Sequence, residues 1–331
     1  MPGIDVHTHF IPEHFPPLPG ARADLAWPCM QHECGHAHVM ISGKRYRTVP
    51  RSSWDGPARQ AAMDAMRISR QVLSPMPELL SYWVPMPEAR LLLRHLNDTL
   101  AELVSRFPQR LCGLGAVPLQ DPDAAIVELE YVVRTLGFPG VEIATHVNGV
   151  SIGDARFRPF FAAAERLGAA LFVHALRPAG KDRLVGPPAL EQVAAFPGDV
   201  ALGIASMMTG GTLEAHPGLR IAFSHGGGAF NSLLPRLQHG WQAIPEVTGC
   251  MQHSPREYAK RLYVDSLTYD EDMLRLALKN FGADRVMMGT DYPFNIHEKN
   301  PHARLDALGL DAAGRAALEE GNARRFLNLS A

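Results

Sequence analysis

The feature of this sequence with the clearest chemical potential is a pair of histidines, His7 and His9, separated by one residue. Residues two apart on a β-strand point to the same side, so both imidazoles would face one direction. Two converging neutral imidazoles are the usual beginning of a zinc or iron site. Taken alone, the pair fits a surface His-x-His without a ligand equally well.

Three further polar residues end short hydrophobic runs, namely His174, His225 and Asp291. A buried histidine or carboxylate without a partner costs several kcal/mol, so five such groups in one layer argue against ordinary core packing. We therefore predict one divalent metal ion bound by His7, His9, His174 and Asp291, with one coordination position left for water or substrate.

We predict a different role for His225. Three glycines follow it at 226–228, a run that lets the backbone approach a ligand and that opens a helix. A neutral imidazole beside the metal can act as a general acid or base near pH 7. The alternative is that His225 is a fifth metal ligand.

The elements that must position these residues alternate along the chain. Hydrophobic runs predict strands at 4–7, 71–74, 111–117, 140–144, 169–174, 220–225, 261–265 and 285–289. Helical periodicity lies between and after them at 57–68, 88–106, 122–135, 157–167, 189–215, 230–241, 270–280 and 312–326. Eight strands, each followed by a helix, predict an α/β fold, a closed (β/α)8 TIM barrel whose active site lies at the carboxyl ends of the strands.

Residues 11–50 are too many for an ordinary loop after the first strand. We predict a small insertion there, with a hairpin over 39–49 that turns at 42–43 and lies over the barrel mouth. A second zinc site would have to come from Cys29, His32, Cys34, His36 and His38. Their spacing matches no common zinc pattern, so a loop that contains them is the preferred interpretation. Residues 1–331 are expected to form one domain.

The composition limits the possible partners. The 331 residues include 32 basic and 34 acidic ones, and this balance predicts no nucleic-acid partner. The absence of a long apolar run predicts no membrane span, and residues 1–5 do not resemble a secretory signal. Four cysteines are too few for a disulfide framework at this length. We therefore expect a cytoplasmic protein.

Seven motifs spread along the chain carry a family resemblance. They are DVHTHF at 5–10, SYW at 81–83, LGFPGV at 136–141, THVN at 145–148, SHGGGAF at 224–230, GTDYPF at 289–294 and GNA at 321–323. With them the chain resembles the amidohydrolase superfamily, and within it the branch of the 2-amino-3-carboxymuconate-6-semialdehyde decarboxylases. The resemblance implies a single zinc on the four ligands predicted above and His225 as the catalytic histidine. The fourth strand has no lysine, unlike that of the two-metal relatives.

The resemblance also implies residues that bind the substrate. Arg47 matches an arginine that binds a substrate carboxylate, and Arg236 matches one that the neighbouring subunit supplies, which implies a homodimer. Guanidinium groups suit carboxylates because they bond to both oxygens. The alternative for each is an ordinary surface arginine. Trp83, just beyond the second strand, either lines the pocket or packs in the core.

One segment departs from the family. After its metal-binding histidine of the fifth strand the family has a Pro-Trp-Asp stretch whose tryptophan reaches the active site. This chain instead reads ALRP at 175–178 and differs to about residue 197. Arg177 either faces an additional anionic group or belongs to an ordinary loop. The departure leaves the metal ligands unchanged and the exact substrate open.

We therefore expect metal-dependent, non-oxidative decarboxylation of an unsaturated or aromatic carboxylic acid. Arg47 and Arg236 would hold the small carboxylate substrate in place, His225 would return a proton to carbon, and Asp291 would bind the metal and pass protons. The same groups suit hydrolysis of a lactone or amide, or hydration of an alkene. A non-catalytic metal-binding relative is a third interpretation, which His225 beside an open coordination position argues against.

Overall fold

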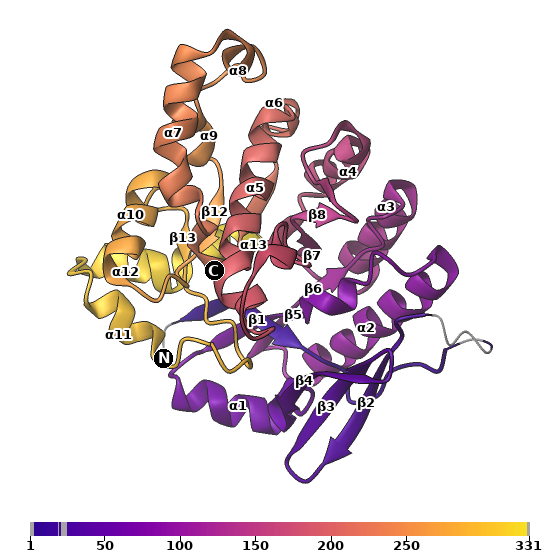
Figure 1. The fold of residues 1–331 in the computed structure, drawn as a ribbon. Coiled ribbons are helices and arrows are strands. Elements are labelled where there is room, and N and C mark those ends of the chain that lie inside the picture. Colours follow the sequence, from indigo (N-terminus) through magenta and orange to yellow (C-terminus); the bar gives the residue numbers. More distant parts are fainter. Residues whose placement is uncertain (1–2, 19, 21–24, 330–331) are drawn as a thin grey trace.

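The computed structural model describes residues 3–18, 20 and 25–329, and its main sheet closes into a barrel (Figure 1). In pairing order the strands are β1 (Ile4–Phe10), β5 (Arg70–Pro75), β6 (Leu111–Ala116), β7 (Gly140–Ala144), β10 (Ala170–His174), β11 (Arg220–Phe223), β12 (Tyr263–Asp265) and β13 (Val286–Met287). A hydrogen bond from the Val6 amide to the Met288 carbonyl (2.9 Å) and a parallel bridge between Thr8 and Tyr292 join the two ends. The predicted (β/α)8 barrel is confirmed.

Helices follow the strands and surround the barrel (Figure 1). The longer ones are α1 (Gly56–Ala65), α2 (Met86–Arg106), α3 (Pro122–Glu130), α4 (Arg158–Leu167), α5 (Phe196–Thr209), α7 (Phe230–Ala243) and α10 (Glu271–Phe281). The shorter ones are α6 (Thr212–Ala215), α8 (Pro245–Gly249), α9 (Pro255–Ala259), α11 (Pro301–Asp306), α12 (Ala312–Ala316) and α13 (Asn322–Leu327). The single helix predicted over 189–215 is wrong: a π-helical turn precedes α5, and Gly211, with φ of 72°, separates α5 from α6.

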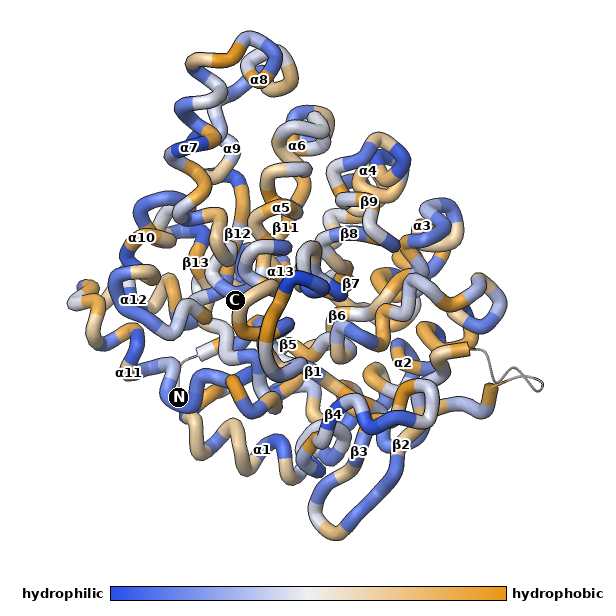
Figure 2. The backbone as a smooth tube through the Cα atoms, in the orientation of Figure 1, coloured by the Kyte–Doolittle hydropathy of each residue, from blue (hydrophilic) through white to orange (hydrophobic). Residues whose placement is uncertain are grey.

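Apolar side chains fill both the space around the barrel and its interior, and Figure 2 shows hydrophobic residues concentrated toward the strands. Leu92 and Leu96 of α2 belong to the outer cluster, as their helical spacing predicts. The inner cluster includes Phe172 of β10 and Phe326 of α13, and the Phe172 ring lies 5.1 Å from that of His7. No helix of the described residues combines the length and apolar character that crossing a membrane requires.

The insertion contains a three-stranded antiparallel sheet, β2 (Pro28–Glu33), β3 (His36–Ile41) and β4 (Lys44–Pro50), beside the barrel (Figure 1). Strands β3 and β4 form the predicted hairpin. Ser42 and Gly43 both have positive φ, 52° and 69°, as a tight two-residue hairpin turn requires. The sequence analysis did not predict β2, because this segment has no β-branched residue to mark it as a strand.

Candidate metal centre

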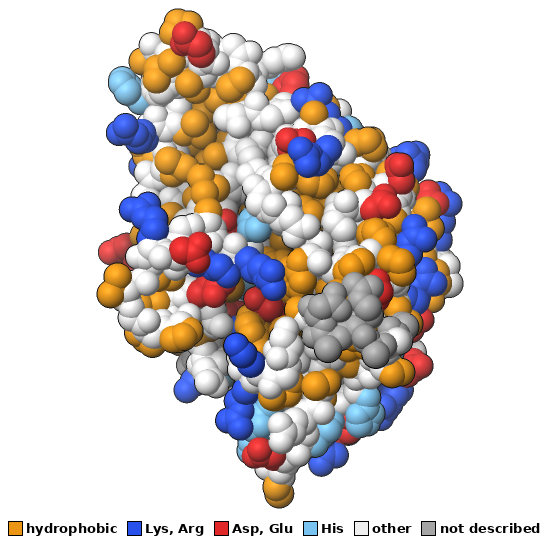
Figure 3. All heavy atoms as spheres, turned by 45° about the vertical axis from the view of Figure 1, so that its right-hand side comes forward, with side chains coloured by type: hydrophobic (Ala, Val, Ile, Leu, Met, Phe, Trp, Pro, Cys, Tyr) orange, Lys and Arg blue, Asp and Glu red, His pale blue; other side chains and the backbone are white. Residues whose placement is uncertain are grey.

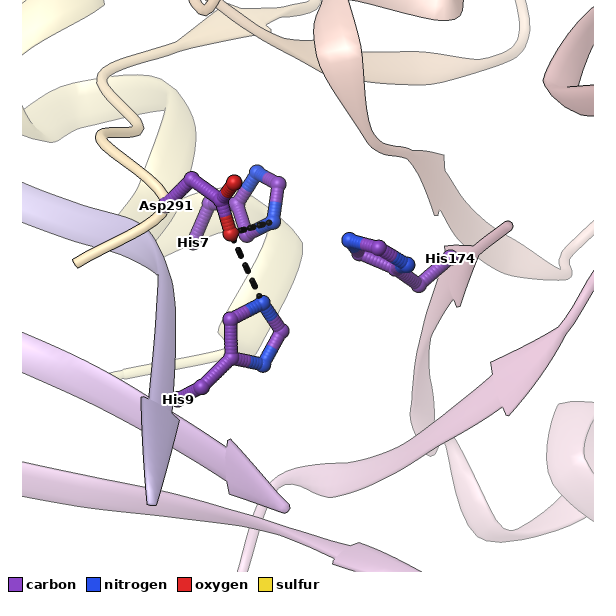
Figure 4. Close-up of side chains that lie close together, drawn as sticks. All are labelled: His7, His9, His174 and Asp291. Carbon is purple, nitrogen blue, oxygen red and sulfur yellow. Dashed lines mark ion pairs between the residues drawn. The ribbon is translucent and has the colours of Figure 1, made fainter. Parts of the chain in front are cut away.

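Four buried side chains converge at the carboxyl ends of the barrel strands (Figure 4). His7 and His9 come from β1, His174 ends β10, and Asp291 follows β13. One ligand atom from each lies within 4.8 Å of the other three. The Asp291 Oδ1 lies 3.4 Å from the Nε2 of His7 and 3.1 Å from that of His9. Ligands bound to one ion at about 2.1 Å have similar mutual distances.

The three imidazoles are fixed through Nδ1. The Nδ1 of His7 lies 2.7 Å from the Asp265 carboxylate, that of His174 lies 2.7 Å from a backbone carbonyl oxygen, and that of His9 lies 3.4 Å from another. A nitrogen that faces such an acceptor carries the proton of a neutral imidazole, so in that form each Nε2 offers a lone pair to a metal ion. These Nε2 atoms and the Asp291 Oδ1 have no hydrogen-bond partner among the described residues. Buried polar atoms without partners are costly, so the donor set fits a divalent ion between them.

The electrostatics of this group also favour a cation. Burial lowers the pKa of His9 to about 4 and that of His174 well below its usual value, so both imidazoles are neutral. Burial acts in the same direction on His7, but the charges of Asp265 and Asp291 outweigh it and raise the pKa to about 9. Without an ion His7 therefore carries a second proton, at Nε2, which a metal ion would displace. Although burial opposes it, His9 and His7, whose Nε2 atoms face the Asp291 carboxylate, hold the pKa of Asp291 below its usual range. The negative potential of the carboxylates therefore dominates the site.

Asp265, the last residue of β12, is a buried site residue that the sequence analysis missed. Besides facing His7, its carboxylate accepts the backbone N–H groups of His225 (2.9 Å) and Gly226 (2.8 Å). One carboxylate thus orients both a predicted ligand and the predicted catalytic histidine. The pattern that could have found it is the one that found Asp291, an acidic residue at the end of a hydrophobic run.

Glu142 of β7 is a second buried carboxyl group near the site that sequence reasoning missed. Its Oε2 accepts a hydrogen bond from Ser74 and lies 3.8 Å from the Nδ1 of His9. Burial raises the pKa of Glu142 to about 8, so this carboxyl is largely neutral at pH 7. It therefore supports the site without adding a full negative charge.

His225 lies beside the four-residue group without belonging to it. Its ring centroid is 4.9 Å from that of His174 and 5.2 Å from that of His7. The His225 Nδ1 lies 2.9 Å from the Ser224 hydroxyl, and Nε2 has no hydrogen-bond partner among the described residues. Burial, and then the charge of His7, lowers the pKa of His225. Its φ of 56° and that of 64° at Asp291 are strained conformations of the kind that cluster at functional sites.

The glycines after His225 are required by packing as well as by access to the cavity. All three have positive φ, and a Cβ atom would collide with Thr268 at Gly226, with Phe281 at Gly227 and with the Pro197 carbonyl at Gly228. This tight turn leads into α7, while Gly228 also lines the cavity described next. The glycines therefore allow protein atoms to approach closely at all three positions, and the approach to a ligand stays a prediction.

A cavity of about 280 Å³ opens beside the group and is lined by His174, His225 and Asp291. Figure 3 shows a hollowed centre on this face, with charged side chains of both signs around it. Much of the lining is apolar, from Pro77, Val193, Phe196, Pro197, Leu267, Met273, Phe294 and Ile296. Arg47 of β4 also lines the cavity, with its guanidinium carbon 3.9 Å from the centre of the Phe294 ring. An apolar space with a few convergent polar groups is typical of a small-molecule site.

The other predicted substrate residues lie away from this cavity. Arg236 is exposed on α7 and is not among the described residues that line it. Trp83 lines a neighbouring cavity of about 400 Å³, where the guanidinium carbon of Arg177 lies 3.1 Å from the centre of its ring. The structure therefore brings Arg47, but neither Trp83 nor Arg236, to the metal group of the same chain.

The insertion contains a second cluster of possible ligands, the hairpin group of Glu33, His36 and His38. The Nε2 atoms of His36 and His38 lie 3.1 and 2.9 Å from the two Glu33 carboxylate oxygens. The His38 Nδ1 lies 2.9 Å from the Thr48 hydroxyl. Cys34, in the turn between β2 and β3, is not a member of the group. The Nε2 atoms of His36 and His38 therefore already have partners, in contrast to those at the barrel mouth.

Comparisons with known proteins match nearly the whole length of the chain. A family model described as Amidohydrolase matches residues 4–329. The chain is 36% identical to 2-amino-3-carboxymuconate-6-semialdehyde decarboxylase of Dictyostelium discoideum, over 98% of this chain and 91% of that one. It is 32% identical to gamma-resorcylate decarboxylase of Rhizobium radiobacter, over 82% and 86%.

A solved structure shares the fold over most of its length. The crystal structure of 5-carboxyvanillate decarboxylase from Novosphingobium aromaticivorans, complexed with manganese and 4-hydroxy-3-methoxy-5-nitrobenzoic acid, is 27% identical with a TM-score of 0.73. The match covers 82% of this chain and 80% of that one. Together with the family match, these relatives show that the chain belongs to the amidohydrolase family, in the branch that includes 2-amino-3-carboxymuconate-6-semialdehyde decarboxylase.

Proposed function

We propose that this protein catalyses the metal-dependent, non-oxidative decarboxylation of an aromatic or unsaturated carboxylic acid. The observation that carries the proposal is the set of four unpartnered ligand atoms beside a largely apolar cavity that also holds His225 and Arg47. The relatives named above, which are decarboxylases, support the same reaction.

His7, His9, His174 and Asp291 would hold one divalent ion. We propose zinc, because three imidazoles and one carboxylate are a common zinc ligand set. Manganese, which the 5-carboxyvanillate decarboxylase structure contains, is the alternative to test. When bound, the ion supplies a Lewis acid that withdraws electron density from a substrate oxygen.

The side chains of the cavity perform the remaining steps. Arg47 binds a carboxylate oxygen and orients the acid, while the apolar walls keep water away from the reacting carbon. The bond between that carbon and the carboxyl group breaks, carbon dioxide leaves, and the electron pair stays on the carbon. His225 takes up a proton from solvent at Nε2 and delivers it to this carbon, which completes the exchange of carbon dioxide for a proton. Asp291, which lines the same cavity, is placed to pass protons as well as to bind the ion.

Release of carbon dioxide by the metal-loaded protein tests this proposal. A panel of hydroxybenzoic, aminobenzoic and unsaturated dicarboxylic acids is compared with lactones, amides and alkenes. We expect release from at least one acid, and His225→Ala should lower kcat by about 10²–10⁴-fold while the metal stays bound. Turnover of a lactone, amide or alkene with no release from any acid would reject decarboxylation, and full activity of His225→Ala would reject its role.

We further propose a cytoplasmic homodimer, each chain a single domain in which the described part of the 11–50 insertion, whose sheet lies beside the barrel, extends Arg47 of β4 over the barrel mouth. The four free cysteines support a reducing compartment. Arg47 at the cavity supports the position of the insertion. Arg236 is exposed on α7, which with α8 projects away from the barrel (Figure 1), and this exposure supports a role for Arg236 in a partner's site.

Hybrid dimers test the shared site. His225→Ala and Arg236→Ala chains, each inactive alone, are unfolded together, refolded and reloaded with metal. In a mixed dimer one of the two sites combines an intact His225 with the partner's intact Arg236, so random mixing should restore about a quarter of the wild-type activity. A mixture that stays inactive although mixed dimers form would reject a shared site.

A further inference from the structure

Glu78 is a buried carboxyl group in the cavity wall that the proposed reaction does not use. It lies in a short 3-10 helix after β5, Pro77–Leu80, and is 8% exposed. It lines the same cavity as His225 and Asp291. A charged group in such a place requires partners, because burial without them is costly.

Some of the partners that the buried Glu78 carboxyl group requires are present in the structure. The Tyr46 hydroxyl forms a hydrogen bond with the Glu78 carboxyl and interacts with the side chain of Arg47. Arg177 and Glu191 also act on Glu78 through their charges. Burial raises the pKa of Glu78, whereas the hydrogen bond from Tyr46 and the charge of Arg47 oppose this shift and favour the carboxylate. The cavity therefore presents a carboxyl acceptor close to the predicted carboxylate-binding cation.

The proximity of Glu78 to Arg47 would favour some carboxylic acids over others. A carboxylate carries several acceptor positions, and one hydrogen bond from Tyr46 leaves others available in the cavity. A ligand that has a carboxylate and no donor would satisfy Arg47 and place apolar atoms or a second negative charge against Glu78. A ligand that also has an N–H or O–H group would satisfy both. Sites that contain a buried polar group reject ligands that cannot pair with it.

We infer that Glu78 is a specificity-determining residue that accepts a hydrogen bond from an amino or hydroxyl group of the substrate. The preferred substrates would then be amino- or hydroxy-substituted acids. The inference that Glu78 selects substrates rests on the proposed decarboxylation. The predicted preference in ligand binding does not depend on that reaction. The competing explanation is that Glu78 merely positions Tyr46 and Arg47, in which case all carboxylates would depend on it equally.

Binding measurements on the metal-loaded protein separate the two explanations. Calorimetry gives Kd values for benzoate and for benzoates with one amino or hydroxyl group at ring positions 2, 3 and 4. We expect the best substituted acid to bind about 10–100-fold more tightly than benzoate, the range for a hydrogen bond to a charged group. Glu78→Leu should abolish this preference by weakening the substituted acid and leaving benzoate within about threefold.

Two further variants complete the test. Glu78→Gln keeps a carbonyl acceptor, so it should retain part of the preference for the hydroxybenzoates. If Glu78→Leu does not fold, Glu78→Gln is measured in its place. Glu191→Gln removes the same charge from a neighbour that is not among the described residues lining the cavity, and should keep the full preference. Equal weakening of benzoate and substituted acids, or no preference in the wild type, would overturn the inference. Failure of the proposed function would appear separately, as no carbon dioxide release from any acid.

Discussion

The barrel-mouth group of His7, His9, His174 and Asp291 and the hairpin group of Glu33, His36 and His38 contain the same kinds of donor atoms. In the barrel all four residues are buried, and their Nε2 and Oδ1 atoms have no hydrogen-bond partner among the described residues. On the hairpin Glu33 and His36 are 45% and 40% exposed in their side chains, and their charged atoms face each other.

The difference shows that donor identity alone does not make a metal site. An exposed carboxylate and an imidazole satisfy each other and water, so a metal ion would have to displace those partners first. In the barrel the strands and the hydrogen bonds at Nδ1 hold the ligands in place. The packing of the fold already offsets the free-energy cost of burying these ligand atoms without partners. A bound ion therefore stabilises the barrel group far more than it would the hairpin group.

The largest expected effect comes from removing one ligand of each group. His9→Ala should lower the metal content from one ion per chain to near zero at equimolar metal. Removing a ligand should weaken metal binding by more than the ~10–100-fold that follows from removing a residue that only hydrogen-bonds a ligand. Decarboxylation should be lost with it. His36→Ala is the matched control and should keep both metal and activity. Metal loss in His36→Ala and not in His9→Ala would reverse the comparison.

A smaller effect is expected from the residue that holds a ligand. Asp265→Asn changes the partner of the His7 Nδ1, so metal affinity should fall by about 10–100-fold, as measured by competition with a chelator. The same change should lower kcat, because Asp265 also holds the backbone of His225. An unchanged affinity would show that the hydrogen bond does not support the metal centre.

The smallest effect is expected from the corresponding partner on the hairpin. Thr48→Val removes the hydroxyl that faces the His38 Nδ1, and should lower the free energy of unfolding by about 1 kcal/mol. Metal content should stay at one ion per chain. Denaturant unfolding and elemental analysis of the same sample check both statements, and a lower metal content would show that the hairpin contributes to metal binding.

The sequence predicted the barrel and the positions of its polar groups because both depend on local patterns. His174 and Asp291 each end a hydrophobic run, and the carboxyl ends of parallel strands meet at one rim. Asp265 has the same pattern and was overlooked. Glu142 and Glu78 were not predictable in this way, because one lies within a strand and the other in a short turn after one. Their burial depends on packing between segments distant in the chain.

Long-range packing also decides the parts that the sequence did not predict. Trp83 follows a strand, as a pocket residue would, yet it packs under Arg177 in a neighbouring cavity. The sequence from 189 to 209 has continuous helical periodicity, yet the structure divides it. Pro197 lies in the first turn of α5 and separates this helix from the π-helical turn before it. The position of a side chain and the end of a helix therefore depend on long-range contacts, which the periodicity of the sequence does not predict.

The central claim is that one divalent ion lies between His7, His9, His174 and Asp291. A crystal structure of the zinc-loaded protein, with anomalous diffraction recorded on both sides of the zinc absorption edge, tests it most directly. We predict one anomalous peak per chain, within about 2.3 Å of the three Nε2 atoms and the Asp291 carboxylate. No peak at that position in zinc-loaded crystals, or a peak at Glu33, His36 and His38 in its place, would contradict it.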